Sequence, residues 1–511
     1  MTIPVADIFA GPGGLGEGFA SLTEHKKRLF NIALSIEKDI FAHQTLLLRS
    51  FFRQFESSEV PREYYFFLRG KITLEQLFVA FPKQAAKTKK EVWLAELGKE
   101  LPENVDRMIR RAISRSNKWV LIGGPPCQAY SLVGRSRRGG IDPKDSRVYL
   151  YREYYRILAV HNPPVFIMEN VKGLLSAEIR ERKIIEQILA DLSDPVAAYR
   201  KLNGNGMGKL SCPGYKIYSL VTPGDRELDG TLAFTPDDFV IRAEDFGIPQ
   251  SRHRLILLGI RTDIDILPSL LTKKKEQVKA ARVLKGLPRL RGGLSEEIDS
   301  AEQWRKALAA LLSNGLLHGS DGRVAAEVKR IIRNLRSPEC DRGSEFVTRK
   351  PSVSYSKRWY LDPSIEGTCN HSSRSHMTSD LFRYVFAACY AKVNGVSPKL
   401  SDFPSQLLPD HRSVEKDVSE SNFADRFRVQ LWNEPARTIT SHISKDGHYY
   451  IHPDPSQCRS LTVREAARLQ TFPDNYYFCG PRTSQYVQVG NAVPPLLALQ
   501  IARIVSEILH H

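Results

Sequence analysis

Residues 119–131 of the chain are W-V-L-I-G-G-P-P-C-Q-A-Y-S, and this stretch decides the fold. The apolar residues Trp119–Ile122 predict a short buried strand, which Gly-Gly-Pro-Pro ends abruptly. Similar apolar runs recur along the first half of the chain, with helix-like stretches such as Tyr151–Val160 between them. These runs are Val5–Phe9, Ile32–Ile36, Val165–Met168 and Leu255–Ile260. The alternation predicts an α/β doubly wound domain with a largely parallel sheet.

The most reactive residue of this stretch is Cys127. A strand followed by Gly-Gly-Pro-Pro places its thiol at the carboxyl edge of the sheet, where open α/β folds bind ligands. Proline restricts the backbone around the thiol, and a nearby helix N-terminus would favour the thiolate, which is the nucleophilic form. The alternative is an inert buried cysteine, which the flanking turn disfavours.

Two further segments bring charged groups to the same edge. The strand Val165–Met168 runs into Glu169, whose carboxyl group could transfer protons if burial raised its pKa, although a structural ion pair is the simpler reading. Arg252 and Arg254 precede the strand Leu255–Ile260 and follow Gln250 at intervals of two. On an extended segment these three side chains share one face, which makes either a charged cleft or an ordinary basic surface strand.

The N-terminus carries a glycine-rich turn, Asp7–Phe19, with Gly11, Gly13 and Gly16 in the pattern G-x-G-x-x-G after a strand. Glycines let the backbone approach a ligand, and the helix that follows offers free N–H groups to an anion. Glu37 ends the next strand, where an acid binds ribose hydroxyls. A dinucleotide satisfies this pattern, and so does a ligand that joins a methionine carboxylate to an adenosine; a turn without a ligand is the third reading.

Composition narrows the class of protein. The chain has 511 residues, 42% of them hydrophobic, which suffices for large cores. Its net charge of +17 favours a polyanionic partner such as nucleic acid, although a solvated basic surface is the alternative. The seven cysteines are scattered without a C-x-x-C pair, which is typical of a reducing cytoplasm. We find neither a signal peptide nor a run of about 18 apolar residues, so we expect no membrane span.

The pattern along the chain predicts three parts. Residues 1–261 form the sheet domain, interrupted at about 41–118 by a charged, helical insertion. Residues 262–455 form a second, irregular domain, and residues 456–511 return to the sheet domain.

Two local motifs lie in the second half of the chain. Thr462-Val-Arg-Glu465 is a capping box, which we interpret as structural. The spacing of Cys369, His371 and His376 fits no standard zinc site, so we expect no metal.

In their order, these segments resemble the DNA (cytosine-5) methyltransferase family. DIFAGPGGLGEGF resembles its cofactor loop, IEKD its ribose-binding acid, GGPPCQAYS its catalytic loop, and MENV and QSRHR its glutamate and arginine motifs. RSLTVREAARLQTFPD resembles the motif after the family's target-recognition domain, and GNAVPP the last motif, which closes the cofactor pocket.

The resemblance implies an S-adenosylmethionine-dependent, Rossmann-like methyltransferase domain with a smaller target-recognition domain at 262–455. It implies S-adenosylmethionine as cofactor. The family also supplies an Asp for the adenine amino group, which has no clear counterpart in this sequence. The cofactor-binding positions that match the family are Phe9, Gly11, Gly13, Gly14, Glu37, Lys38, Pro125, Leu150, Asn491 and Val493.

The resemblance also implies a mechanism. Cytosine is flipped out of the duplex, which costs a few kcal/mol. Cys127 attacks C6, Glu169 holds or protonates N3, and Arg254, with Arg252 beside it, binds O2 and orients the ring. The basic, glycine-containing stretch Gly134–Arg147 would be a loop that closes over DNA, or else an ordinary surface loop.

For partners, the resemblance implies double-stranded DNA and a bacterial restriction–modification system. We therefore expect a cytoplasmic monomer, with a cognate restriction endonuclease acting on the same site. Two alternatives stay open: an RNA cytosine-5 methyltransferase, and a non-catalytic DNA-binding protein of the same fold. A nicotinamide-dependent oxidoreductase is a third and weaker alternative, because the Pro-Cys loop has no role in such an enzyme.

Overall fold

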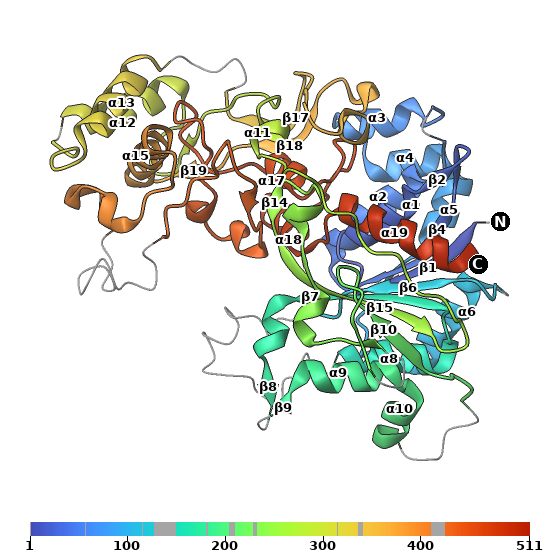
Figure 1. Ribbon diagram of the computed structural model, residues 1–511. Coiled ribbons are helices and arrows are strands. Elements are labelled where there is room, and N and C mark those ends of the chain that lie inside the picture. The colour runs from blue at the N-terminus through green and yellow to red at the C-terminus, as the bar shows by residue number, and fades with distance from the viewer. Residues whose placement is uncertain are drawn as a thin grey trace. The chain divides into compact units, whose positions relative to one another are not determined.

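The chain forms two compact units in the computed structural model (Figure 1). The first unit comprises residues 1–60, 78–276 and 492–511, and the second comprises 61–77 and 277–491. The structure describes residues 2–56, 58–114, 116–126, 150–179, 182–203, 210–227, 232–313, 315–335, 341–409 and 425–510.

A mixed sheet is the centre of the first unit, with strand order β10-β15-β7-β6-β1-β4-β5. The strands β5 (Val92–Leu94), β4 (Phe30–Glu37), β1 (Ile3–Ile8), β6 (Val120–Gly123) and β7 (Val165–Val171) run parallel. The strand β15 (His253–Arg261) is antiparallel to β7, and both β10 (Tyr215–Tyr218) and β13 (Val240–Arg242) are antiparallel to β15. The predicted α/β sheet is confirmed, with an antiparallel edge added to its parallel part.

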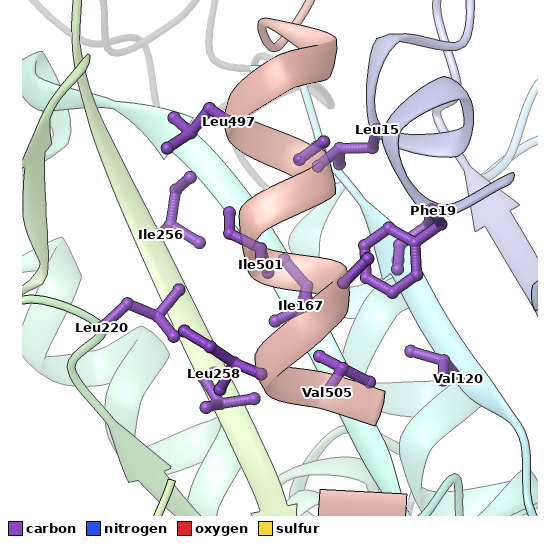
Figure 2. Packing of buried hydrophobic residues seen from close by; sticks show 14 of the residues in the cluster. Leu15, Phe19, Val120, Ile167, Leu220, Ile256, Leu258, Leu497, Ile501 and Val505 are labelled. Carbon is purple, nitrogen blue, oxygen red and sulfur yellow. The ribbon is translucent and has the colours of Figure 1, made fainter. Parts of the chain in front are cut away.

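Helices cover both faces of this sheet. On one face α6 (Pro102–Ile113), α8 (Tyr151–His161) and α9 (Ile184–Ser193) pack against Leu121, while on the other α1 (Gly14–Ala20) and α19 (Pro495–His510) pack against Val120 and Ile122. Figure 2 shows Leu497, Ile501 and Val505 of α19 at intervals of four, directed toward the sheet. Because both faces are buried, the strands are mainly apolar, with buried polar exceptions such as Asp7 of β1 and Ser35 of β4, and this is why their sequence signal is strong.

The stretch Arg482–His510 is apolar enough to cross a membrane, with a mean hydropathy of 1.5. However, 72% of its most apolar window is buried inside the structure, and α19 within it is a core helix of the first unit. Its hydrophobicity is therefore accounted for by packing against the sheet.

The interval 41–118, expected to be a helical insertion, is not helical throughout. It contains α2 (Ile40–Phe52), α5 (Pro82–Glu91) and α6, but also β5, which pairs in parallel with β4. The expectation is wrong at β5, because three residues are too short a run to show a strand period. Moreover, α3 (Arg62–Leu68) lies in the second unit together with the start of α4 (Leu74–Ala80).

The second unit has a helical core. Its helices α12 (Ala301–Ser313), α13 (Gly322–Arg333) and α15 (Thr378–Asn394) pack around a cluster that includes Trp304 and Tyr384. Beside them lie the antiparallel strands β17 (Gly343–Val347) and β18 (Thr368–Ser372), then α17 (Val463–Leu469) and α18 (Arg482–Asn491). Apart from residues 61–77, this compact unit spans 277–491 and so includes 456–491. The role of residues 262–455 in target recognition stays a prediction.

Short elements complete both units. In the first they are β2 (Thr23–Glu24), β3 (Lys27–Arg28), β8 (Glu178–Ile179), β9 (Arg182–Lys183), α10 (Pro195–Asn203), β11 (Asp225–Arg226), β12 (Leu232–Ala233) and β14 (Gln250–Ser251). In the second they are α11 (Ala281–Leu284), β16 (Gly293–Leu294), α14 (Lys357–Tyr360), β19 (Ser375–His376) and β20 (Ala436–Arg437).

The capping box predicted at Thr462 is confirmed at the start of α17. The Thr462 side chain accepts a hydrogen bond from the Glu465 backbone, and the Glu465 carboxylate accepts one from Thr462 N at 2.8 Å. Arg459 donates two hydrogen bonds of 2.7 Å to the same carboxylate. The start of α17 is thus held by fully buried charged groups.

Candidate active site

The strand register gathers the predicted site residues of the first unit along one edge of the sheet. Ile8 pairs with Ile36 and with Gly123, and Gly123 pairs with Met168, so the segments that follow these strands emerge side by side. Since β15 is antiparallel, its beginning lies at this edge, and Arg254 pairs with Val171 at the end of β7. Residues far apart in the sequence therefore share one carboxyl edge, where α/β folds bind ligands.

The glycine-rich turn after β1 has an unusual backbone. Phe9, Gly11 and Gly13 have φ values of 53°, 56° and 89°, in the left-handed region that favours glycine. A Cβ on Gly11 would meet no atom within 4 Å, whereas a Cβ on Gly14 would lie 2.2 Å from the Val493 carbonyl oxygen. Gly14 is thus required by close packing against the last motif, while Gly11 borders open space that a ligand can fill.

Glu37, at the end of β4, joins this turn to the next strand. Its carboxylate accepts hydrogen bonds from the backbone N–H groups of Gly11 (2.7 Å), Lys38 (2.9 Å) and Asp39 (2.8 Å). Burial raises its pKa, although these three hydrogen bonds oppose the shift. A carboxylate has about four acceptor positions, so one remains for a ligand hydroxyl.

A residue that the sequence pattern did not reveal lies beside Glu37. Glu96 follows β5, and its carboxylate pairs with the Lys38 ammonium at 3.3 Å. It occupies the sheet edge where the adenine-binding acid of the family is expected. The sequence pattern did not reveal Glu96 because the strand before it, β5, is short and lies within a charged, mainly helical interval.

The catalytic candidates Glu169 and Arg254 are brought together. Arg254 Nε lies 2.9 Å from Glu169 Oε1, and both side chains are 12% exposed. Burial raises the pKa of Glu169, while the Arg254 and Arg252 guanidinium groups lower it; the net shift is upward. Glu169 is therefore a carboxyl group that gains protons more readily than an ordinary glutamate.

The catalytic loop begins next to this carboxyl group. A Cβ on Gly124 would lie 2.8 Å from Glu169 Oε2, so only glycine fits there without displacement. Pro125 is buried directly after it. Cys127 and the predicted loop Gly134–Arg147 lie outside the described residues, and their placement stays a prediction.

The arginine motif departs from a simple extended segment. Arg252 N donates to Gln250 O at 2.9 Å, which is a tight three-residue turn, so the predicted common face of Gln250, Arg252 and Arg254 is interrupted at its start. Arg252 is fully buried, whereas Arg254 retains some exposure. The two arginines thus differ in access: Arg254 is the one able to reach a ligand.

The remaining predicted cofactor residues lie in different places. Leu150 precedes α8, and a Cβ on Gly98 would lie 2.9 Å from its side chain, which puts Leu150 beside the segment after β5. Val493 contacts the glycine-rich turn, as described above. Asn491 is the last residue of α18 and lies in the second unit.

The cysteine and histidines considered for zinc each contact other protein groups. The His371 ring nitrogens lie 2.9 Å from Thr462 Oγ1 and 2.8 Å from Pro288 O, and His376 Nε2 lies 3.4 Å from Ser460 Oγ. In the part of the chain that the structure describes, no three His, Cys, Asp or Glu side chains form a group that could hold a metal.

The Glu169–Arg254 pair next to Gly124, at the carboxyl edge of a sheet that also carries the glycine-rich turn and Glu37, is the arrangement expected of a cytosine-5 methyltransferase. Comparison with known proteins agrees. Residues 83–195 and 235–507 match the family described as C-5 cytosine-specific DNA methylase, and the chain belongs to this family. The protein is a DNA (cytosine-5-)-methyltransferase.

Similar proteins support this assignment. The chain is 33% identical to the type II methyltransferase M.Bpa9945I of Bacillus paralicheniformis, over 99% of this chain and 100% of that protein. It is 25% identical to the type II methyltransferase M.DdeI of Desulfomicrobium norvegicum, over 98% and 88%. It is 26% identical to the DNA (cytosine-5-)-methyltransferase M.ApeKI of Aeropyrum pernix, over 76% of this chain and 81% of that protein.

Proposed function

We propose that the carboxyl edge of the sheet methylates C5 of a cytosine flipped out of duplex DNA, with Cys127 as nucleophile and S-adenosylmethionine as methyl donor. The observation that carries this assignment is the Glu169–Arg254 pair beside Gly124, three residues before Cys127. A cytosine ring placed there would find an acid and a guanidinium group within reach of its N3 and O2 atoms.

The residues present fit the cofactor. The backbone at Gly11 borders open space, Glu37 keeps an acceptor position for a ribose hydroxyl, and Glu96 supplies a carboxylate for the adenine amino group. Leu150 and Val493 supply apolar contacts, and Lys38, Pro125 and Asn491 are further candidates from the motif match. When bound, S-adenosylmethionine supplies an electrophilic methyl group on a sulfonium.

The side chains of the chain divide the reaction between them. The Cys127 thiolate adds to C6 of the ring, which turns C5 into a nucleophilic enamine carbon. Glu169, whose pKa is raised by burial, holds a proton at N3, so negative charge does not accumulate on the ring. Arg254 donates to O2 and orients the ring, and Arg252 holds positive charge behind Glu169. After methylation, a base removes the C5 proton, the C6–S bond breaks, and the thiolate is regenerated.

The test is methyl transfer to DNA. Purified protein is incubated with unmethylated genomic DNA and tritiated S-adenosylmethionine, next to a Cys127→Ala variant. We expect label in 5-methylcytosine from the wild type and none from the variant. If the wild type binds the cofactor but places label on transfer RNA instead of DNA, the proposed substrate is wrong.

The biological setting follows from the relatives. We propose that the region 262–455 reads the target sequence and that the protein protects bacterial DNA, as a cytoplasmic monomer, against a cognate restriction endonuclease. The basic charge of +17 and the type II methyltransferase relatives support this setting. Mapping the methylated sites in genomic DNA, and testing whether a neighbouring nuclease fails to cut them, would test it.

A further inference from the structure

Two arginines of the second unit donate hydrogen bonds to one backbone carbonyl, and a third arginine lies beside them. The third, Arg374, donates to the backbone carbonyl of Ile443. Ser373 O accepts a hydrogen bond from Arg482 Nη1 at 2.8 Å and another from Arg342 Nη2 at 3.2 Å. Arg374 follows Ser373 directly, and its guanidinium carbon lies 4.2 Å from the centre of the Tyr486 ring. Tyr486 lies one helical turn after Arg482 on α18, so the three side chains form a group, here called the arginine cluster (Arg342, Arg374 and Arg482).

The positive charge of the arginine cluster is poorly compensated. Arg342 pairs with Asp299 at 3.0 Å; Asp299 also pairs with Arg291 at 2.7 Å, and Arg291 has a second acid in Asp341, so the uncompensated charge is that of Arg374 and Arg482. Neither Arg374 nor Arg482 pairs with a carboxylate among the described residues. Burial lowers the pKa of Arg482, and the charges of Arg374 and Arg342 lower it further; Tyr486 and Glu345 oppose the shift, but the net change is downward.

Two other buried arginines of this unit, Arg459 and Arg468, have a structural role, and each is paired with a carboxylate. Arg459 makes two hydrogen bonds to the Glu465 carboxylate, and Arg468 makes two to the Asp474 carboxylate, at 2.9 and 2.7 Å. Each of these buried arginines is neutralised by its own acid, as burial of a charge requires. Arg374 and Arg482 are half-buried and, unlike Arg459 and Arg468, have no such acid. The fully buried Arg464 has none either, but its guanidinium group is held by three backbone carbonyls.

Hydrogen-bond donors next to the arginine cluster also lack an acceptor. The Ser373 side chain is 2% exposed, and its hydroxyl has no hydrogen-bond partner in the described structure; the same holds for Arg342 Nε. Buried polar groups are nearly always hydrogen-bonded, so these two require an explanation. Moreover, the first hydrogen bond at the start of α18 is from Gln485 N to Pro481 O, which leaves the N–H groups of residues 482–484 without a partner inside the helix.

We propose that the arginine cluster, with the Ser373 hydroxyl, binds a phosphate group of the DNA backbone. The cluster presents several donors and little negative charge, and guanidinium groups match the geometry of phosphate oxygens. Such a contact positions DNA without reading its sequence. This inference rests on the proposed DNA substrate and adds a binding site to it.

The test uses the salt dependence of DNA binding. Affinity of the full-length protein for a fluorescein-labelled duplex of random sequence is measured by anisotropy over a range of chloride concentrations. Each lost phosphate contact lowers the slope of log K against log salt by about 0.9. We expect Arg482→Gln to lower the slope by about this amount and Arg482→Lys to keep most of it.

The control is Arg323→Gln, which removes an exposed arginine of α13 that pairs with Asp321 at 3.2 Å. Its slope should equal that of the wild type. If Arg482→Gln binds DNA with the slope and affinity of the wild type, the proposal is wrong. A purely structural role would lower the fraction of active protein without changing the slope, and would also contradict the proposal.

A second arm separates DNA from free phosphate. Inorganic phosphate is added at constant ionic strength without DNA, and thermal unfolding is followed for the wild type and Arg482→Gln. Protection of the wild type alone, together with an unchanged salt slope, would assign the cluster to free phosphate and overturn the DNA contact. Failure of the proposed methylation is a separate result, because it would abolish label transfer in the wild type while leaving the salt slopes measurable.

Discussion

The two units use the same pair of residue types in opposite ways. In the first unit Arg254 makes one contact with Glu169, both side chains keep 12% exposure, and burial raises the pKa of the carboxyl group. In the second, Arg459 makes two hydrogen bonds to Glu465, and both are almost fully buried. Burial acts to raise the pKa of Glu465 as well, but Arg459 and His452 hold it well below the usual range.

The difference shows how contacts decide the role of a buried acid. A carboxylate that also accepts a backbone hydrogen bond from Thr462 is locked in its charged form and supports the fold. A carboxyl group with one guanidinium contact at a sheet edge remains able to hold a proton, which is what a catalytic acid requires. The following predictions test this contrast.

The largest expected effect is on catalysis at Glu169. The substitution Glu169→Gln removes the group that holds the proton at N3 of the cytosine. General acid–base groups contribute about 100- to 10,000-fold to a reaction rate. We expect single-turnover methyl transfer to fall by that factor while thermal unfolding changes little. A variant that methylates DNA at the wild-type rate would remove Glu169 from the mechanism.

The matching change in the second unit should act on stability. Glu465→Gln leaves the buried Arg459 without its carboxylate, and breaking a buried pair costs about 3–5 kcal/mol of unfolding free energy. Denaturant unfolding measures the loss. As a control, Glu366→Gln removes the acid of an exposed pair with Arg69 and should cost no more than about 1 kcal/mol. Equal effects of both variants would contradict the structural role of Glu465.

Acid should weaken the second unit through its buried histidines. Burial lowers the pKa of His371 and of His452 from 6.5 to about 4 in each case. Between these values the unfolded chain binds more protons than the folded one, so stability is complete above about pH 6.5 and falls as the pH decreases toward 4. We expect a loss of about 2 kcal/mol for each histidine at about pH 5.

Denaturant unfolding across this pH range tests the expectation. The variant His371→Gln can keep the hydrogen bond to Pro288 O. Its unfolding free energy should fall less than that of the wild type between pH 6.5 and pH 4, by the contribution of one histidine. The same pH dependence in the variant and the wild type would show that His371 does not titrate in this way.

The smallest expected effect is the loss of stability when either of two glycines is replaced by alanine. Gly11 and Gly70 have φ values of 56° and 68°, and a Cβ on either would meet no atom within 4 Å. Gly11→Ala and Gly70→Ala should therefore lose similar stability, about 1–2 kcal/mol, from the left-handed backbone alone. Only Gly11→Ala should weaken binding of S-adenosylmethionine, as measured by calorimetry. Equal cofactor affinity in both variants would place the cofactor away from the glycine-rich turn.

Much of the first unit could be predicted from the sequence because its strands are short, mainly apolar and closed by glycine or an acid. Trp119–Ile122 and Val165–Met168 correspond closely to β6 and β7. The strand β5 was missed, because its three residues become a strand only through pairing with β4. The direction of β15, which brings Arg254 to Glu169, is likewise set by pairing with β7 and not by local pattern.

The second unit was less predictable for a related reason. Its buried arginines, such as Arg459 and Arg464, have the composition of a basic surface, and only long-range contacts show that they are interior. The segment 61–77 belongs to this unit although hundreds of residues separate it from its contacts, among them the hydrogen bond of 3.0 Å from the Tyr65 hydroxyl to Asp362. Patterns within a short window do not carry such information.

The central claim, that Cys127 is the nucleophile at the sheet edge beside Glu169, is tested most directly by covalent trapping. A duplex that contains 5-fluorocytosine at the methylated position is incubated with S-adenosylmethionine and either the wild type or Cys127→Ser. Because fluorine at C5 cannot leave as the proton does, the account predicts a wild-type adduct that survives denaturing electrophoresis, carried by the peptide with Cys127, and none for the variant. An adduct in Cys127→Ser, or none in a wild type that methylates ordinary DNA, would contradict it.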